Sequence, residues 1–170
     1  MRLRQGLTAH AAAVLLLCCA LPLAAGAAST FDRLRGAWAT AAGAPAVMEW
    51  TGSGEGFTVS FTPPGGAAVT VEFAPSARPA VLAGKVKAGW MGSMFGGDDP
   101  VNPLAEGTLF WARTADDAVY LYSLAVDDKG GFQLDRYRCA PQGNALTVTL
   151  DRRTPAGGES TEQQLVRAGS

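Results

Sequence analysis

Histidine, cysteine and acidic side chains build most catalytic and metal sites, so their placement limits the chemistry open to this chain. The only histidine among the 170 residues is His10, which lies in an N-terminal segment with the features of an export leader. A mature chain without histidine excludes Ser-His-Asp and Cys-His catalysis, and also histidine-bound zinc and haem. Carboxylate-based hydrolysis and metal sites built from oxygen ligands remain compatible with the 15 acidic residues.

Three acidic pairs are the candidates for such sites: Asp98-Asp99, Asp116-Asp117 and Asp127-Asp128. Each pair stands beside turn-forming or polar residues, where aspartate caps backbone amides. None of them has the alternating ligand spacing of a calcium loop. We therefore interpret the pairs as turn residues and expect no metal and no cofactor.

Cys139 is the one cysteine outside the leader. Its neighbour Arg138 could lower the thiol pKa, but no histidine or second cysteine is present to complete a redox or nucleophilic site. Tyr120 and Tyr122 likewise carry no local catalytic signature. We expect a buried, inert thiol, no catalytic residues and a non-enzymatic protein.

The N-terminus has the three parts of a secretory signal. Arg2 and Arg4 precede an apolar run from Ala11 to Leu21, and Ala25-Gly26-Ala27 offers a small-residue cleavage site. The run is too short for the roughly 20 residues that a transmembrane helix needs. Residues 1–27 are predicted to be a cleaved signal peptide, which leaves no transmembrane segment in the mature chain.

Export implies a periplasmic or extracellular protein. Cys18 and Cys19 lie in the leader, and lipid attachment there is disfavoured because no small residue precedes either one. Without them the mature chain cannot form an internal disulfide. Residues 28–170 have the length of one domain. Removal of two arginines takes the formal charge from −1 to −3, so nucleic acid is not an expected partner.

Strict alternation of apolar and polar residues dominates this domain. Phe57, Val59 and Phe61 alternate with polar residues, and after a Pro-Gly turn the pattern resumes from Val69 to Phe73. Many short strands in sequence predict an all-β protein, a single antiparallel up-and-down barrel of about 8–10 strands, with a sandwich as the alternative. The remaining expected strands are Gly36 to Thr40, Val47 to Trp50, Val81 to Lys87, Thr108 to Arg113, Ala118 to Val126, Phe132 to Cys139, Ala145 to Asp151 and Gln163 to Arg167.

The start of the domain supports the barrel. The segment Phe31 to Trp38 contains Gly36-Ala37-Trp38 and resembles the G-x-W opening of lipocalin-like (calycin) barrels, where a helical turn, here Ser29 to Arg35, leads into the first strand. The resemblance implies that Trp38 packs across the closed end of the barrel against an arginine of the last strand. Arg167 is the residue that matches this partner.

The interior of such a barrel is either packed with side chains or hollow. The apolar residues expected to point inward would form the core of a packed barrel or the lining of a hollow one. They are Phe57, Phe61, Phe73, Trp111, Leu146, Val148 and Leu150. Arg113, Arg136 and Arg138 share strand faces with apolar residues. If these faces turn inward, the arginines would receive a carboxylate at the barrel mouth; if they curve outward, they are solvated.

The segment from Ala88 to Gly107 has no periodicity, which is unusual in a compact domain. Its apolar side chains, among them Met91, predict a lid or plug over the barrel mouth, or a surface that faces a partner or a membrane. Together with the strand residues, the candidate ligand-binding set is Trp90, Met94, Phe95, Trp111, Arg113, Arg136 and Arg138.

Two roles follow from these patterns. The first is binding of a small apolar or amphipathic molecule inside the barrel. The second is binding of a protein, as in barrels that act as periplasmic protease inhibitors or envelope interaction proteins. In that case Ala28 to Phe31 would serve as an inserting N-terminal strand. Such inhibitors usually carry a disulfide, which disfavours this second role.

Overall fold

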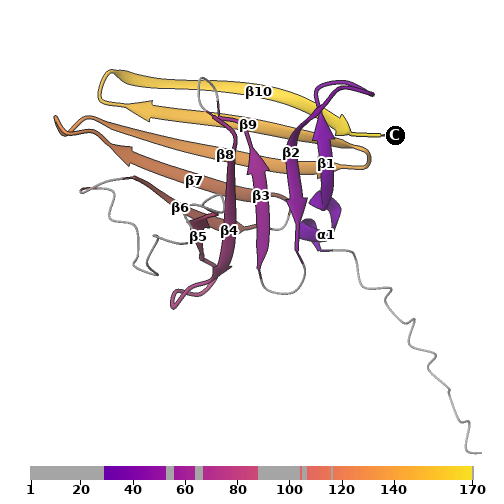
Figure 1. The fold of residues 1–170 in the computed structure, drawn as a ribbon, viewed down its shortest axis with the longest axis horizontal. Helices are drawn as coiled ribbons and strands as arrows, with labels where there is room; N and C mark the ends of the chain where they lie inside the picture. The colour runs from indigo at the N-terminus through magenta and orange to yellow at the C-terminus, as the bar shows by residue number, and fades with distance from the viewer. Residues whose placement is uncertain are drawn as a thin grey trace, which may run out of the picture.

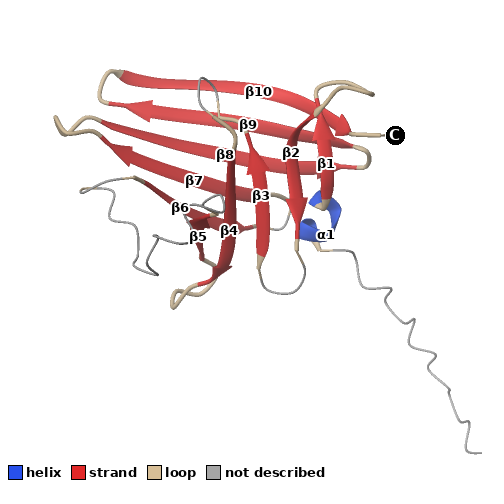
Figure 2. Cartoon of the chain, in the orientation of Figure 1, coloured by secondary structure: helices blue, strands red, loops and turns tan. Residues whose placement is uncertain are grey.

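The computed structural model of the chain describes residues 29–52, 56–63, 67–87, 104, 107–115 and 117–169. These residues form one short helix and ten strands (Figures 1 and 2). The strands close into an antiparallel barrel in which each strand pairs with the next along the chain. The prediction of an all-β up-and-down barrel is therefore confirmed, whereas residues 1–27 lie outside the described chain.

The first half of the barrel is built from short elements and the second half from long ones. The helix α1 covers Thr30–Leu34. The five strands of the first half are β1 (Gly36–Ala39), β2 (Ala46–Thr51), β3 (Phe57–Phe61), β4 (Val69–Pro75) and β5 (Leu82–Val86). The five of the second half are β6 (Thr108–Thr114), β7 (Val119–Val126), β8 (Phe132–Gln142), β9 (Ala145–Thr154) and β10 (Gly157–Arg167).

The long strands extend well past the short ones. Figure 1 shows the β7–β8 and β9–β10 hairpins projecting beyond β2, β3 and β4, which cross them steeply. The start of β10 differs from the expectation by six residues, because the strand begins at Gly157 instead of Gln163. The missed residues are polar and exposed on both faces, so they carry no alternation that could reveal a strand.

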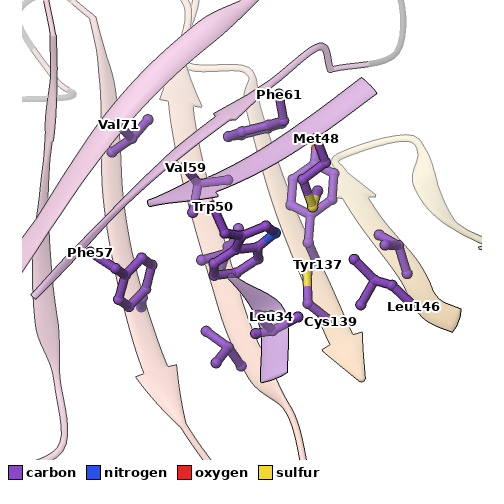
Figure 3. Packing of buried hydrophobic residues seen from close by; sticks show 14 of the residues in the cluster. Leu34, Met48, Trp50, Phe57, Val59, Phe61, Val71, Tyr137, Cys139 and Leu146 are labelled. Carbon is purple, nitrogen blue, oxygen red and sulfur yellow. The ribbon is translucent and has the colours of Figure 1, made fainter. Parts of the chain in front are cut away.

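Inward-facing apolar side chains fill the barrel near α1. Trp38 and Trp50 are fully buried, and the rings of Phe57 and Phe73 lie 4.9 Å apart. Figure 3 shows Trp50 between Phe57 and Met48 in this core. Phe61, Leu146, Val148 and Leu150 are also buried. The Nε1 of Trp50 is a buried donor with no acceptor among the described residues. Its desolvation is offset by the packing of Phe31 and Phe57 against the indole.

Trp111 is the exception among the residues expected inside. Its neighbours Phe110 and Ala112 are buried, while Trp111 itself is only partly covered. Because alternate residues of a strand face opposite sides of the sheet, Trp111 lies on the outer face of β6. The expectation that it lines the interior is wrong.

The closed end of the barrel is organised around Trp38 and Arg167. The Arg167 guanidinium lies 4.5 Å from the centre of the Trp38 ring. Its Nη1 donates to the carbonyl oxygen of Arg35 at 2.6 Å, and its Nη2 to that of Arg33 at 2.9 Å. Trp38 Nε1 donates to the carbonyl of Leu34 at 2.7 Å. Three carbonyls at the end of α1, which a helix leaves without partners, are thus satisfied by side chains of β1 and β10.

Gly36 makes room for this arrangement. Its φ angle is +114°, which favours glycine, and a Cβ atom at this position would lie 2.9 Å from Nη1 of Arg167. Ser29 fixes the other end of α1, because its hydroxyl accepts from the Asp32 backbone and the Asp32 carboxylate accepts from the Ser29 backbone. The expected helical turn before the first strand is therefore present.

Replacing Arg167→Ala is expected to lower the free energy of unfolding by about 2 kcal/mol. The change removes a cation–π contact and leaves two helix-end carbonyls without their donors. The free energy of unfolding of Arg167→Lys should lie between those of the unchanged protein and Arg167→Ala, because an ammonium cannot bridge both carbonyls. Urea denaturation measures the effect, with the exposed Arg153→Ala as a control. If Arg167→Ala and Arg153→Ala lowered the free energy of unfolding equally, the role of Arg167 in closing the barrel would be contradicted.

Candidate functional site

The barrel contains a cavity of about 320 Å³ at the end away from α1. Phe61, Val69, Val86 and Phe110 form its apolar wall. Its polar lining comes from Thr108, Ser123, Gln133 and Asp135. The volume lies at the lower end of the range typical of small-molecule sites, which combine apolar walls with a few convergent polar groups.

A buried ion pair stands at the polar side of the cavity. Asp135, on β8, is 2% exposed. Its Oδ1 accepts from Arg152 Nε at 2.9 Å, and its Oδ2 from Arg152 Nη2 at 3.1 Å. Gln133 Nε2 also donates to Oδ2 at 2.9 Å. The hydrogen bond to Asp135 raises the pKa of Arg152 further above its usual value, so the guanidinium stays charged at neutral pH.

A second, shallower hollow of about 550 Å³ adjoins this cavity between the tips of the two long hairpins. It shares Ala125 and Gln133 with the cavity and includes Phe132, which is 42% exposed. Asp127 shapes the β7–β8 turn beside it by accepting from the backbone of Lys129 and Gly131. The interpretation of this aspartate as a turn residue is confirmed.

Four of the predicted ligand-binding residues lie together, but on the outside of the barrel. Trp111 and Tyr122 stack with parallel rings 4.9 Å apart on β6 and β7. Arg136 is the cross-strand neighbour of Tyr122, and Arg113 that of Tyr120. Their buried neighbours on the same strands, among them Tyr137 and Cys139 on β8, occupy the inner face.

The arginines of this outer face do not form a free anion receptor. Arg136 Nη2 lies 2.6 Å from Asp151 Oδ2, and Arg138 Nη2 lies 2.6 Å from Asp117 Oδ2. Hydrogen bonds from Ser160 and then Arg136 lower the pKa of Asp151. Of the two orientations open to Arg113, Arg136 and Arg138, the structure has the outward one. The expectation that they receive a carboxylate at the barrel mouth is therefore wrong.

Trp90, Met94 and Phe95, the remaining members of the predicted set, lie outside the described residues. The predicted lid also falls there, apart from Leu104 and Gly107. The flanking strands β5 and β6 contribute Val86 and Thr108 to the cavity wall. The role of these three residues stays a prediction.

Sequence reasoning missed Asp135 and Arg152, the charged pair of the site. A signal was present, because Asp135 alternates with Tyr137 and Cys139 and therefore shares their inward face. Burial raises the pKa of the Tyr137 phenol and of the Cys139 thiol to about 12 each. Both groups are neutral near pH 7, as expected for an inert thiol. The described part of the chain holds no cluster of histidine, cysteine and acidic residues suited to a metal.

Comparison of the chain with protein-family models, curated proteins and solved structures finds no match. Within the described residues, no helix is long and apolar enough to cross a membrane.

Replacing Arg152→Met is expected to lower the free energy of unfolding by about 3 kcal/mol, because it leaves the buried Asp135 charge without its partner. Combining it with Asp135→Leu should recover most of that loss, since no lone charge remains. Urea denaturation of both single variants and the double variant measures the coupling. If the double variant lost as much free energy of unfolding as the two single variants together, a paired, buried arrangement would be contradicted.

Cys139 is expected to resist thiol reagents in the folded protein. With a pKa of about 12 the thiolate fraction at pH 8 is on the order of one part in ten thousand, and the side chain is fully buried. Reaction with a chromogenic disulfide in native buffer should be slow and should accelerate in urea. Rapid modification without denaturant would show that the thiol is reachable.

Proposed function

We propose that this protein is an exported, non-enzymatic barrel that binds a small amphipathic molecule in the 320 Å³ cavity. The observation that carries the proposal is the distribution of side chains around this cavity. Apolar groups of β3, β4, β5 and β6 face a polar side on β7 and β8. That division suits a ligand with an apolar body and one polar end.

The polar end of the ligand is a neutral group. Arg152 is already neutralised by Asp135, whose two oxygens together accept three hydrogen bonds. A carboxylate entering here would meet the Asp135 charge with no free cation to balance it. A hydroxyl or amide suits the site better, because Ser123 offers a hydroxyl and Gln133 retains a free amide oxygen as acceptor.

Family likeness and export support the same role. The G-x-W start, the contact of Arg167 with Trp38 and the up-and-down order of ten strands resemble the lipocalin-like (calycin) barrels. The predicted signal peptide favours a periplasmic or extracellular site of action.

Three side chains that could take part in catalysis have structural roles instead. Cys139 is buried with a raised thiol pKa, Asp127 caps a turn, and Asp135 pairs with Arg152. Tyr120 and Tyr122 lie on the outer face of β7, away from the cavity. These assignments favour binding over catalysis.

Native mass spectrometry of the protein purified gently from producing cells tests the proposal. A reproducible mass excess is expected, and it should disappear after denaturing extraction. Ala125→Trp should abolish the excess, because Ala125 lines the cavity and an indole there would fill it. Native mass spectrometry also measures the uptake of added neutral long-chain alcohols and of the matching carboxylates. The unchanged protein should take up the alcohols in preference to the carboxylates, and Ala125→Trp should take up neither.

Ala74→Trp is the matched control, because Ala74 is exposed on the outside of β4. It should keep the excess mass and the uptake seen in the unchanged protein. A clean apoprotein mass with no uptake of any apolar probe would refute the carrier role. An excess that survives Ala125→Trp would place the ligand elsewhere.

A further inference from the structure

Among the residues that the structure describes, nothing pairs with one edge of β10 over most of its length. β10 pairs with β9 from Gly157 to Val166, whereas β1 meets it only at Val166 and Arg167. No described strand pairs with the other edge of β10 from Gly157 to Leu165. At roughly 3.4 Å per residue this open edge is about 27 Å long. The barrel wall therefore has a gap where β1 ends and the chain turns into β2.

The backbone of β10 presents hydrogen-bonding groups to this gap. The N–H of Ala168 donates to the carbonyl of Ala37 at 2.9 Å, which places the polar groups of residue 168 on the β1 side. The backbone N–H and C=O groups of successive residues point to opposite edges of an antiparallel strand, and the β9–β10 register is regular. The backbone groups that face the gap therefore belong to Gly158, Ser160, Glu162 and Gln164.

An apolar groove of about 110 Å³ lies beside the gap. Val148 and Leu150 of β9 and Tyr137 of β8 line one side, and Met48 and Phe61 of β2 and β3 line the other. Thr161 and Gln163 of β10 also line it. A strand added along β10 would direct every second side chain toward this groove, in register with the inward residues of β10.

The charge of the edge selects the occupant. Glu162 faces outward beside the gap and is exposed, and the open stretch from Gly157 to Leu165 contains no lysine or arginine. Glu159 of this stretch is already paired with Arg152 at 3.4 Å, but Glu162 has no lysine or arginine on its own strand segment. Antiparallel pairing of two copies of this edge would bring their Glu162 side chains close together, so self-association is disfavoured. A strand with apolar residues inward and a basic residue opposite Glu162 satisfies both faces.

We propose that the open edge of β10 takes up an extended segment of a partner protein as an added strand. The backbone of the segment pairs with Gly158, Ser160, Glu162 and Gln164. Its apolar side chains enter the groove between β10 and β2, and its lysine or arginine side chains lie beside Glu162. This surface is distinct from the cavity proposed for the small molecule, although Phe61 borders both.

Amide hydrogen exchange with synthetic peptides tests the proposal. The probes are two capped hexapeptides, Val-Lys repeated three times and Val-Glu repeated three times, added to the purified protein. Without peptide, the amides of residues 158, 160, 162 and 164 should exchange fast and the odd-numbered amides slowly. The Val-Lys peptide should slow the even-numbered set at least tenfold, and the Val-Glu peptide should not.

Two variants separate backbone pairing from charge. Gln164→Pro removes one donor that faces the gap, at an edge position where proline is tolerated, and should weaken binding of the Val-Lys peptide about tenfold. Unchanged protection of the odd-numbered amides verifies that its fold is intact. Glu162→Lys should reverse the preference in favour of the Val-Glu peptide. Glu72→Lys on β4 makes the same charge reversal away from the gap and should leave the preference unchanged.

Three results would overturn the proposal. The first is slow exchange of the even-numbered amides in the peptide-free protein at all concentrations, which would mean that the edge is already paired. The second is protection that appears only as protein concentration rises, which would assign the edge to a second copy of the chain. The third is the absence of tenfold protection by millimolar Val-Lys peptide.

Discussion

The contact between Arg167 and the first segment of the domain holds the two ends of the barrel together. β1 and β10 share only two residue pairs, so the backbone alone provides little closure. One guanidinium covers the Trp38 ring and binds two carbonyls at the end of α1. The same residues bury the end of the core, because Leu34 and Trp38 are fully inaccessible. Closure and core packing thus depend on a single cluster.

The strand β1, which takes part in closure, is too short to cover the whole of β10. β1 is only four residues long, whereas β10 has eleven, so the described strands leave most of one edge of β10 without a partner. Where β1 is missing, apolar side chains of β8 and β9 border a groove, and the β10 edge stays polar and acidic. Polar and acidic residues protect an unpaired edge against uncontrolled association.

The two faces of the second half of the barrel use charge differently. Inside, the buried Asp135 is paired with Arg152, which also lies 3.4 Å from the exposed Glu159. Outside, Arg136 and Arg138 are each matched by an aspartate in contact with water. Buried charges require partners because of desolvation, whereas exposed pairs contribute little to stability. The interior pair therefore sets the polarity of one side of the cavity, whereas the exterior pairs lie on the outer face of the sheet.

The chain by itself determined the class of fold, the helical turn before β1 and nearly all strands, because period-2 alternation and Pro-Gly turns are local features of the sequence. The contact at the closed end was predicted from the resemblance of the G-x-W start to lipocalin-like barrels, which implied an arginine of the last strand as the partner of Trp38. Tertiary structure decided which face of each strand is inside. Alternation shows that Trp111, Arg113 and their neighbours share a face, but not on which side of the sheet that face lies. The pairing of Asp135 with Arg152 and the gap beside β10 depend on register between strands, which no local pattern encodes.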